Sequence, residues 1–216
     1  MRYERLLLGD WHPVVRDPID VLRLTFLIGA AGFLLSGDVK GTANLLLGAT
    51  VVLVARAIDL PRPYDLGLVL AMTLTGWGEA LGLFERIVFY DNVVHFLVPG
   101  LVAPVLYMLC VRLHVLPDLD DPAARRGELG LFLTTFALGM AVGGVYEVVE
   151  WAADGTVGSN LSTGNGDTNS DLLSDMLGSI GGAYLLVVWS RAGWTTVRRA
   201  PREAVVRWLE QRRAEA

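Results

Sequence analysis

The sequence predicts an all-α, polytopic transmembrane helix bundle with about six spans and both termini in the cytoplasm. Hydrophobic residues make up 53% of the 216-residue chain, and its mean hydropathy is +0.46. Several apolar runs approach the ~20 residues that cross a bilayer. Lys and Arg gather at both ends and in alternate connections, as expected of cytoplasmic segments. We therefore expect one membrane domain and no separate soluble domain.

The six expected spans are joined by short connections. In chain order they are Ile19–Ser36, Thr42–Ile58, Leu66–Phe84, Ile87–Leu113, Leu129–Ala152 and Asp171–Ser190. The first two are short enough to be tilted or partly interfacial. Pro99 and Pro104 predict a kink in the fourth span. The connection 153–170 is rich in Gly, Ser, Thr and Asn and contains no Lys or Arg, which predicts an external loop.

The regions flanking the bundle differ from it in composition. Residues 1–16 are predicted to be a cytoplasmic or interfacial N-terminus, and residues 17–190 the bundle itself. Residues 191–216 form a basic cytoplasmic tail in which apolar residues alternate with arginines. This tail is either an amphipathic helix on the anionic inner leaflet or only a positively charged anchor.

Composition also excludes several classes of function. The net charge is −5, and no basic surface of the kind that nucleic acid requires is evident. The single cysteine, Cys110, excludes an intramolecular disulfide framework. The apolar run 6–8 is too short for a cleavable signal peptide, so the first span is expected to direct insertion. The expected partner is the lipid bilayer of a bacterial plasma membrane, and the oligomeric state is left open.

Small residues at helical spacing predict close contacts between helices. Gly139 and Gly143 lie in the fifth expected span, and Gly178 and Gly182 lie in the sixth. A small residue at every fourth position lets two backbones approach closely. These contacts belong either to the core of the bundle, the interpretation we favour, or to a dimer interface.

Three helix-spaced polar pairs stand out in this apolar chain. They are Asp91 with His95, Glu147 with Glu150, and Asp171 with Asp175. Because residues three or four apart share a helix face, each pair is expected to point in one direction. With the orientation predicted from Lys and Arg, all three pairs and Glu79 lie within roughly 10 Å of the external boundary. Ionisable residues at membrane depth are costly and usually functional.

So many carboxylates cannot be ionised together at low dielectric without compensation, and a divalent cation is the simplest source of it. The predicted metal ligands are Asp91, His95, Glu147, Glu150 and Asp175, with Glu79 and Asp167 as additional candidates. The predicted catalytic carboxylates are Asp171 and Glu150, one of which would be the general base. This ligand set follows the logic of di-metal carboxylate bundles. One imidazole among oxygens suits Mg, Mn, Fe or Zn, and the choice stays open.

Each residue of this set also has a simpler interpretation. Asp91 and Asp171 could cap the fourth and sixth helices, His95 could be a satisfied core histidine, and the glutamates could be solvated. No cap accounts for Asp175, which lies a full turn deeper. Asp167, Asn169 and Asp171 match the start of a calcium loop, but Leu172 and Gly178 occupy positions where an EF-hand requires Gly and Glu. Tyr90 and Tyr146 either line the site or belong to an aromatic belt.

Three segments of the chain resemble the YjdF family of bacterial inner-membrane proteins in order and spacing. They are Asp91-x-x-x-His95, Tyr146-Glu147-x-x-Glu150-Trp151 and Gly166-Asp167-x-x-x-Asp171-x-x-x-Asp175-Met176. The sequence differs from the family pattern at residues 164–170. A more distant resemblance is to VanZ-like proteins, which pair a similar Asp-x-x-x-His with later acidic helices. The resemblance implies a multi-pass membrane protein and no settled activity.

Three functions are compatible with these observations. The first is a metal-dependent enzyme at the outer face that hydrolyses or transfers a group of an envelope lipid or lipid-linked molecule. The second is a cation or proton translocator, because intramembrane acids often mark ion paths. The third is a non-catalytic membrane accessory protein in which the acids only join helices.

Overall fold

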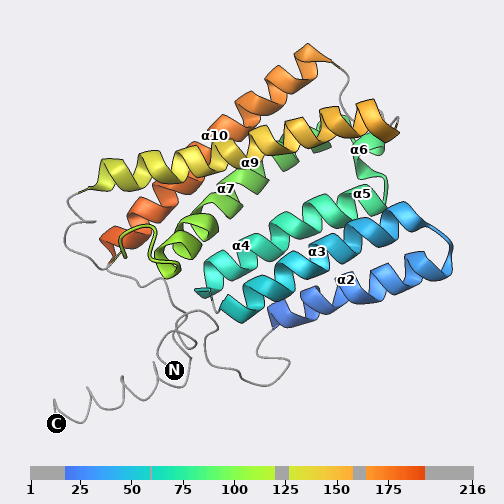
Figure 1. Ribbon diagram of the computed structural model, residues 1–216, viewed down its shortest axis with the longest axis horizontal. Helices are drawn as coiled ribbons and strands as arrows, with labels where there is room; N and C mark the ends of the chain where they lie inside the picture. Colours follow the sequence, from blue (N-terminus) through green and yellow to red (C-terminus); the bar gives the residue numbers. More distant parts are fainter. Residues whose placement is uncertain (1–17, 59, 120–126, 158–163, 193–216) are drawn as a thin grey trace, which may run out of the picture.

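The computed structural model describes residues 18–58, 60–119, 127–157 and 164–192, and these residues contain helices and no strand. The helices are α2 (Pro18–Leu35), α3 (Val39–Ile58), α4 (Arg62–Met72), α5 (Gly78–Ala80), α6 (Leu83–Arg86), α7 (Tyr90–Arg112), α9 (Glu128–Val157) and α10 (Asn165–Arg191), with the π-helix η1 (Thr73–Trp77) between α4 and α5. They form two groups, α2–α3–α4 and α7–α9–α10, joined where α4 packs on α7 (Figure 1). The all-helical prediction is confirmed for this part of the chain.

Four of the described helices are long and apolar enough to cross a membrane. They are Val39–Arg56, Tyr90–Arg112, Glu128–Thr156 and Asn165–Arg191. The other two expected spans correspond to α2 and to the series from α4 to α5, so six spans stay a prediction. The cytoplasmic placement of the ends also stays a prediction, because residues 1–17 and 193–216 lie outside the described residues.

The third expected span, Leu66–Phe84, is not one regular helix. Its middle turn is the π-helix η1, and α5 ends at Ala80. Gly82, just before α6, has a φ of 64°, the left-handed conformation that glycine adopts without strain. A π-helical turn widens the backbone locally and is common at functional sites. Here it brings Thr75 to the face of the bundle that contacts α7.

The connection between the last two spans is shorter than the sequence predicts. The helix α9 continues to Val157, and α10 begins at Asn165, six residues before the expected start at Asp171. The predicted external loop 153–170 is therefore largely helical where it is described, and residues 158–163 lie outside the described residues. The extra turns place Asp171 inside a helix.

Two apolar cores hold the bundle together. One joins α2, α3 and α4, with Phe26, Leu45 and Val52 fully buried. The other lies where α7 and α10 meet α3, α4 and α9, around Met108 and Leu186. Many apolar side chains on the outer faces of the helices are exposed, as expected when lipid covers those faces.

The backbones of α7 and α10 touch directly. A methyl group added to Gly178 would collide with the carbonyl oxygen of Phe96, and one added to Gly182 would collide with that of Gly100. Pro104 has no N–H, so the Gly100 carbonyl lacks its usual helical donor and is available for this contact. The glycine spacing in the sixth expected span therefore serves packing within the bundle.

A buried group of ion-paired side chains ties α2 to α3 and α4. We call Asp20, Arg23, Arg56 and Asp65 the paired cluster. Arg23 is 2% exposed and donates to Asp20 at 2.6 Å, to Asp65 and to the Val52 carbonyl at 3.2 Å. Arg56 donates to Asp20 at 2.9 Å. Two guanidinium groups therefore balance two carboxylates where α2 and α4 begin and α3 ends.

Candidate functional site

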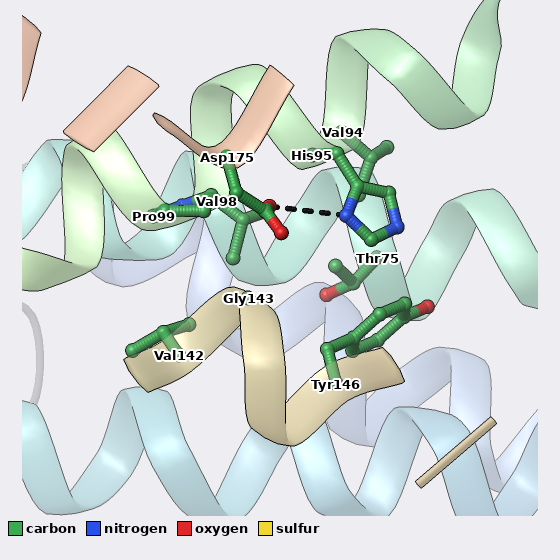
Figure 2. Close-up of a pocket in the computed structure, with 9 residues that line it drawn as sticks. All are labelled: Thr75, Val94, His95, Val98, Pro99, Val142, Gly143, Tyr146 and Asp175. Carbon is green, nitrogen blue, oxygen red and sulfur yellow. Dashed lines mark hydrogen bonds and ion pairs between the residues drawn. The ribbon is translucent and has the colours of Figure 1, made fainter. Parts of the chain in front are cut away.

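His95 lies in the second turn of α7 and is the centre of the candidate site. Only 3% of the residue is exposed. Its Nδ1 is 3.0 Å from Oδ1 of Asp175 on α10 (Figure 2). The direct contact between α7 and α10 makes this distance possible, because Gly178 lies one turn after Asp175 and lets the two backbones meet. The pair fixes the orientation of the imidazole ring.

The second nitrogen of His95 faces two carboxylate oxygens without a hydrogen bond. Nε2 is 3.5 Å from Oδ1 of Asp91 and 3.8 Å from Oε1 of Glu147. Both distances exceed the usual 2.7–3.2 Å of an N–H···O hydrogen bond. All three atoms are buried and have no hydrogen-bond partner among the described residues. Buried polar atoms are rarely left in this state, so the arrangement calls for a ligand.

We call six residues the acidic cluster: Asp91, His95, Glu147, Glu150, Asp171 and Asp175. Three helices supply them, since α7, α9 and α10 each contribute one of the pairs found in the sequence. All are less than 9% exposed except Asp91, whose side chain is 29% exposed. The geometry thus brings together the five predicted metal ligands and both predicted catalytic carboxylates.

The donor atoms of the cluster fit a metal ion. Two sets of three ligand atoms lie within 4.8 Å of one another, the first from Asp91, His95 and Asp171 and the second from His95, Glu147 and Glu150. Ligand atoms that share an ion at about 2.1 Å lie roughly 3–3.5 Å apart. The distances from Nε2 to its two carboxylate neighbours are close to this spacing. Oxygens with one imidazole suit a hard or borderline divalent cation.

Two carboxylates of the acidic cluster form hydrogen bonds with other side chains. Asp175 accepts from or donates to His95 according to the tautomer of the ring, and its Oδ2 is buried and unpartnered. Asn92 donates to Oδ1 of Asp171 at 3.2 Å and to Oγ of Ser170 at 2.9 Å. Ser179, one turn below Asp175, is fully buried and its Oγ has no hydrogen-bond partner among the described residues.

A small cavity adjoins the His95–Asp175 pair. Its volume is about 20 Å³, enough for one water molecule. Thr75 of η1 and Tyr146 of α9 line it together with the pair, and Gly143 forms part of its wall (Figure 2). The ring of Tyr146 meets that of His95 edge to face, with centroids 5.2 Å apart. Of the two interpretations open for Tyr146, the structure supports a place in the site.

The two additional ligand candidates belong to neither set of donor atoms. Glu79 on α5 forms an ion pair with Lys40 of α3 at 2.5 Å, so a protein cation already neutralises it. Asp167 lies in the first turn of α10 and is half-buried. The residues that the sequence did not single out are Thr75, Asn92 and Ser179. Hydroxyl and amide side chains are common in such a chain, so no pattern distinguished them.

The capping interpretation of Asp91 and Asp171 is wrong. The residues that precede α7 and α10 are Phe89 and Gly164, and neither helix has a side-chain cap hydrogen bond. Asp91 lies within the first turn of α7, where the helix dipole favours a carboxylate. Asp171 lies in the second turn of α10 and is 2% exposed. Capping therefore does not account for either side chain.

Residues 35–192 match the model of a family described as a predicted membrane protein (DUF2238), and the chain belongs to this family. It is the YjdF family, so the resemblance carried by the three acidic segments is confirmed. The match includes all six residues of the acidic cluster. No curated protein and no solved structure matches the chain.

Proposed function

We propose that this member of the DUF2238 family is a metal-dependent membrane enzyme whose acidic cluster holds a divalent cation. The observation that carries the proposal is the buried Nε2 of His95, which faces Asp91 and Glu147 without a hydrogen bond. A neutral imidazole whose Nδ1–H donates to Asp175 presents a lone pair at Nε2. That lone pair and two carboxylate oxygens would repel one another, and a cation between them removes the repulsion.

Each residue of the cluster has a distinct part in this proposal. His95, Glu147 and Glu150 would hold the cation, with Asp91 beside them. Asp175 would orient His95 through Nδ1, as carboxylates behind a ligating histidine do at many metal sites, rather than bind the cation itself. A bound divalent cation would supply Lewis acidity toward a carbonyl or phosphoryl oxygen.

Asp171 is the best placed general base. Its Oδ1 accepts a hydrogen bond from Asn92, and it belongs to the set of donor atoms that contains neither glutamate. A carboxylate held by one hydrogen bond keeps free lone pairs with which to accept a proton from a water nucleophile. Asp171 would then pass this proton to the leaving group.

The substrate we propose is an envelope lipid or a lipid-linked group. The cluster lies near the ends of three apolar helices, and its neighbours Phe96, Val148 and Leu177 are exposed toward the membrane side of the bundle. A substrate anchored in the bilayer reaches such a site laterally. The charge distribution of the sequence predicts that this end of the bundle faces the external side of a bacterial inner membrane.

The test is the metal content of the protein purified in mild detergent without chelators. Wild type is compared with His95→Ala and with Glu147→Gln, and Glu128→Gln serves as a control on the same helix as Glu147. Glu128 is exposed and pairs with Arg191 at the opposite end of α9. We expect bound metal in wild type and in the control, and the loss of one metal ion per chain in both site variants. A wild-type protein without metal after loading with Mn²⁺ or Zn²⁺ contradicts the proposal.

A translocator is the second candidate, and one observation favours it. Asp175 and Ser179 follow each other along α10, both fully buried and each with an unpartnered oxygen, as in the first steps of a proton path. At the opposite end of the bundle, however, the paired cluster is closed by its own ion pairs. Proton or cation flux into proteoliposomes, lost in Ser179→Ala, would favour translocation over catalysis.

A further inference from the structure

The acidic cluster contains more ligand atoms than one ion can use. The two sets of donor atoms have only His95 in common. Nδ1 of His95 is engaged with Asp175, so the ring has one nitrogen left and can bind one ion. If the first set also binds an ion, that ion must be held by carboxylates alone.

We propose that the cluster binds two divalent cations, an inference that rests on the proposed metal-binding function. The first cation takes Nε2 of His95 with Glu147 and Glu150. All three residues are more than nine-tenths buried, and both Nε2 and Oε1 of Glu147 lack hydrogen-bond partners. The second cation takes Asp91 and Asp171, an oxygen-only site of the kind that Mg²⁺ and Mn²⁺ prefer. In the doubly occupied cluster Asp171 is therefore a ligand, and the general-base role proposed for it applies to the cluster with one cation.

Asp91 connects the two positions. Its Oδ1 is buried, has no hydrogen-bond partner and lies 3.5 Å from Nε2 of His95, while the residue also belongs to the set with Asp171. A carboxylate has two oxygens, and one bound to each cation makes a bridge. Carboxylates on facing helices hold paired ions in this way in di-metal bundles.

The charge of the cluster supports two cations. Within the described part of the chain, no Lys or Arg pairs with any of its five carboxylates, whose ion pairs are all with His95. Fully ionised, these five groups carry a charge of −5. One divalent cation leaves −3 in a largely buried space, and two leave −1. Because unbalanced buried charge is costly, the doubly occupied cluster is the better balanced one.

A substitution at Asp171 distinguishes the two ion positions by experiment. Asn92 donates to one oxygen of Asp171 at 3.2 Å. Changing Asp171 to Asn removes the charge at the second position and keeps the volume of the side chain. The first position retains all three of its proposed ligands.

The experiment counts Mn²⁺ per chain in the full-length, detergent-purified protein. Equilibrium dialysis against MnCl₂ with elemental analysis gives the number, and electron paramagnetic resonance detects spin coupling between ions roughly 3.5–4 Å apart. We expect two coupled Mn²⁺ in wild type and in Glu128→Gln, and one uncoupled Mn²⁺ in Asp171→Asn. Circular dichroism confirms that each variant keeps its helices.

The outcomes separate this inference from the function on which it rests. One Mn²⁺ in wild type, retained by Asp171→Asn, overturns the two-ion proposal and leaves a single metal site. Two Mn²⁺ in both proteins overturns the assignment of Asp171. No Mn²⁺ in wild type overturns both proposals.

Discussion

The paired cluster and the acidic cluster bury charge at opposite ends of the same bundle. Among the described residues, the charges of the paired cluster are balanced by other side chains, and those of the acidic cluster are not. In the paired cluster Arg23 and Arg56 face Asp20 and Asp65, and Arg23 donates three hydrogen bonds. In the acidic cluster five carboxylates surround one imidazole, and four of the six residues have an unpartnered buried atom. The first lies where α2 and α4 begin, and the second near the starts of α7 and α10; Figure 1 shows these helix starts at opposite ends of the bundle.

This difference separates a structural role from a binding role. Buried ion pairs hold elements in a fixed relation, and breaking one leaves an uncompensated charge. An unsatisfied polar group weakens the fold until a ligand arrives, and functional sites commonly carry this cost. We therefore expect changes in the paired cluster to affect stability, and changes in the acidic cluster to affect ligand binding.

The largest expected effect is on stability in the paired cluster. Arg23→Met leaves Asp20 and Asp65 buried without their shared partner, and we expect it to lower the free energy of unfolding by about 3–5 kcal/mol. Unfolding in detergent, followed by circular dichroism as denaturant is added, measures the change. The exposed Arg191→Met is the control. A loss below about 1 kcal/mol in Arg23→Met would mean that the paired cluster is not structural.

The next largest effect is expected in the acidic cluster, where binding of a cation should raise the free energy of unfolding. A cation at one hundred times its Kd stabilises the folded state by about 2.7 kcal/mol, and thermal unfolding with and without Mn²⁺ measures this gain. Glu147→Gln should reduce the gain, because it removes a ligand of the first cation. Without metal, the same variant should be more stable than wild type, because it removes one of five mutually repelling charges. A variant less stable than metal-free wild type would show that Glu147 serves the fold.

A smaller effect tests how the two helices create the acidic cluster. Gly178→Ala places a methyl group against the carbonyl oxygen of Phe96, and we expect a loss of about 1–3 kcal/mol. The separation of α7 and α10 should also weaken the binding of Mn²⁺, because Asp175 moves away from His95. Gly181→Ala is a matched control in the same helix, since an added methyl group there meets nothing within 4 Å. Equal metal affinity in both variants would contradict this account.

The smallest effect is expected at an exposed ion pair. Glu128→Gln removes the partner of Arg191, whose side chain is 60% exposed. Exposed pairs contribute about 0–1 kcal/mol because solvent screens them. The unfolding assay used for Arg23→Met should detect little change, and metal content should match wild type. A larger loss in the free energy of unfolding would mean that this exposed ion pair stabilises the fold in the way expected only of buried pairs.

The acidic cluster was predictable from the sequence for two reasons: the spacing of its residues along each helix, and the opposite directions of successive helices. Residues three or four apart share a helix face, and successive antiparallel helices bring one end of each together. The paired cluster was not predictable in this way, because Arg23 and Asp65 are 42 residues apart and no motif joins them.

Helix ends and irregular turns also could not be predicted from the sequence. The third expected span reads as one apolar run, but a π-helical turn interrupts it, and the polar start of α10 resembles a loop in composition. The roles of Glu79 and Lys40 depended on the contact between α3 and α5. Tertiary contacts, which no local pattern records, decided each of these points.

The contribution of three helices to the acidic cluster has a consequence for how the protein is made. Its donors come from α7, α9 and α10, and α10 is the last of the described helices to leave the ribosome. The set with Asp171 cannot be complete, and Asp175 cannot orient His95 for the other set, until that helix has entered the membrane. Under the proposed function, full loading with metal would then be the closing step of biogenesis, and a chain truncated before α10 would lack the second ion position.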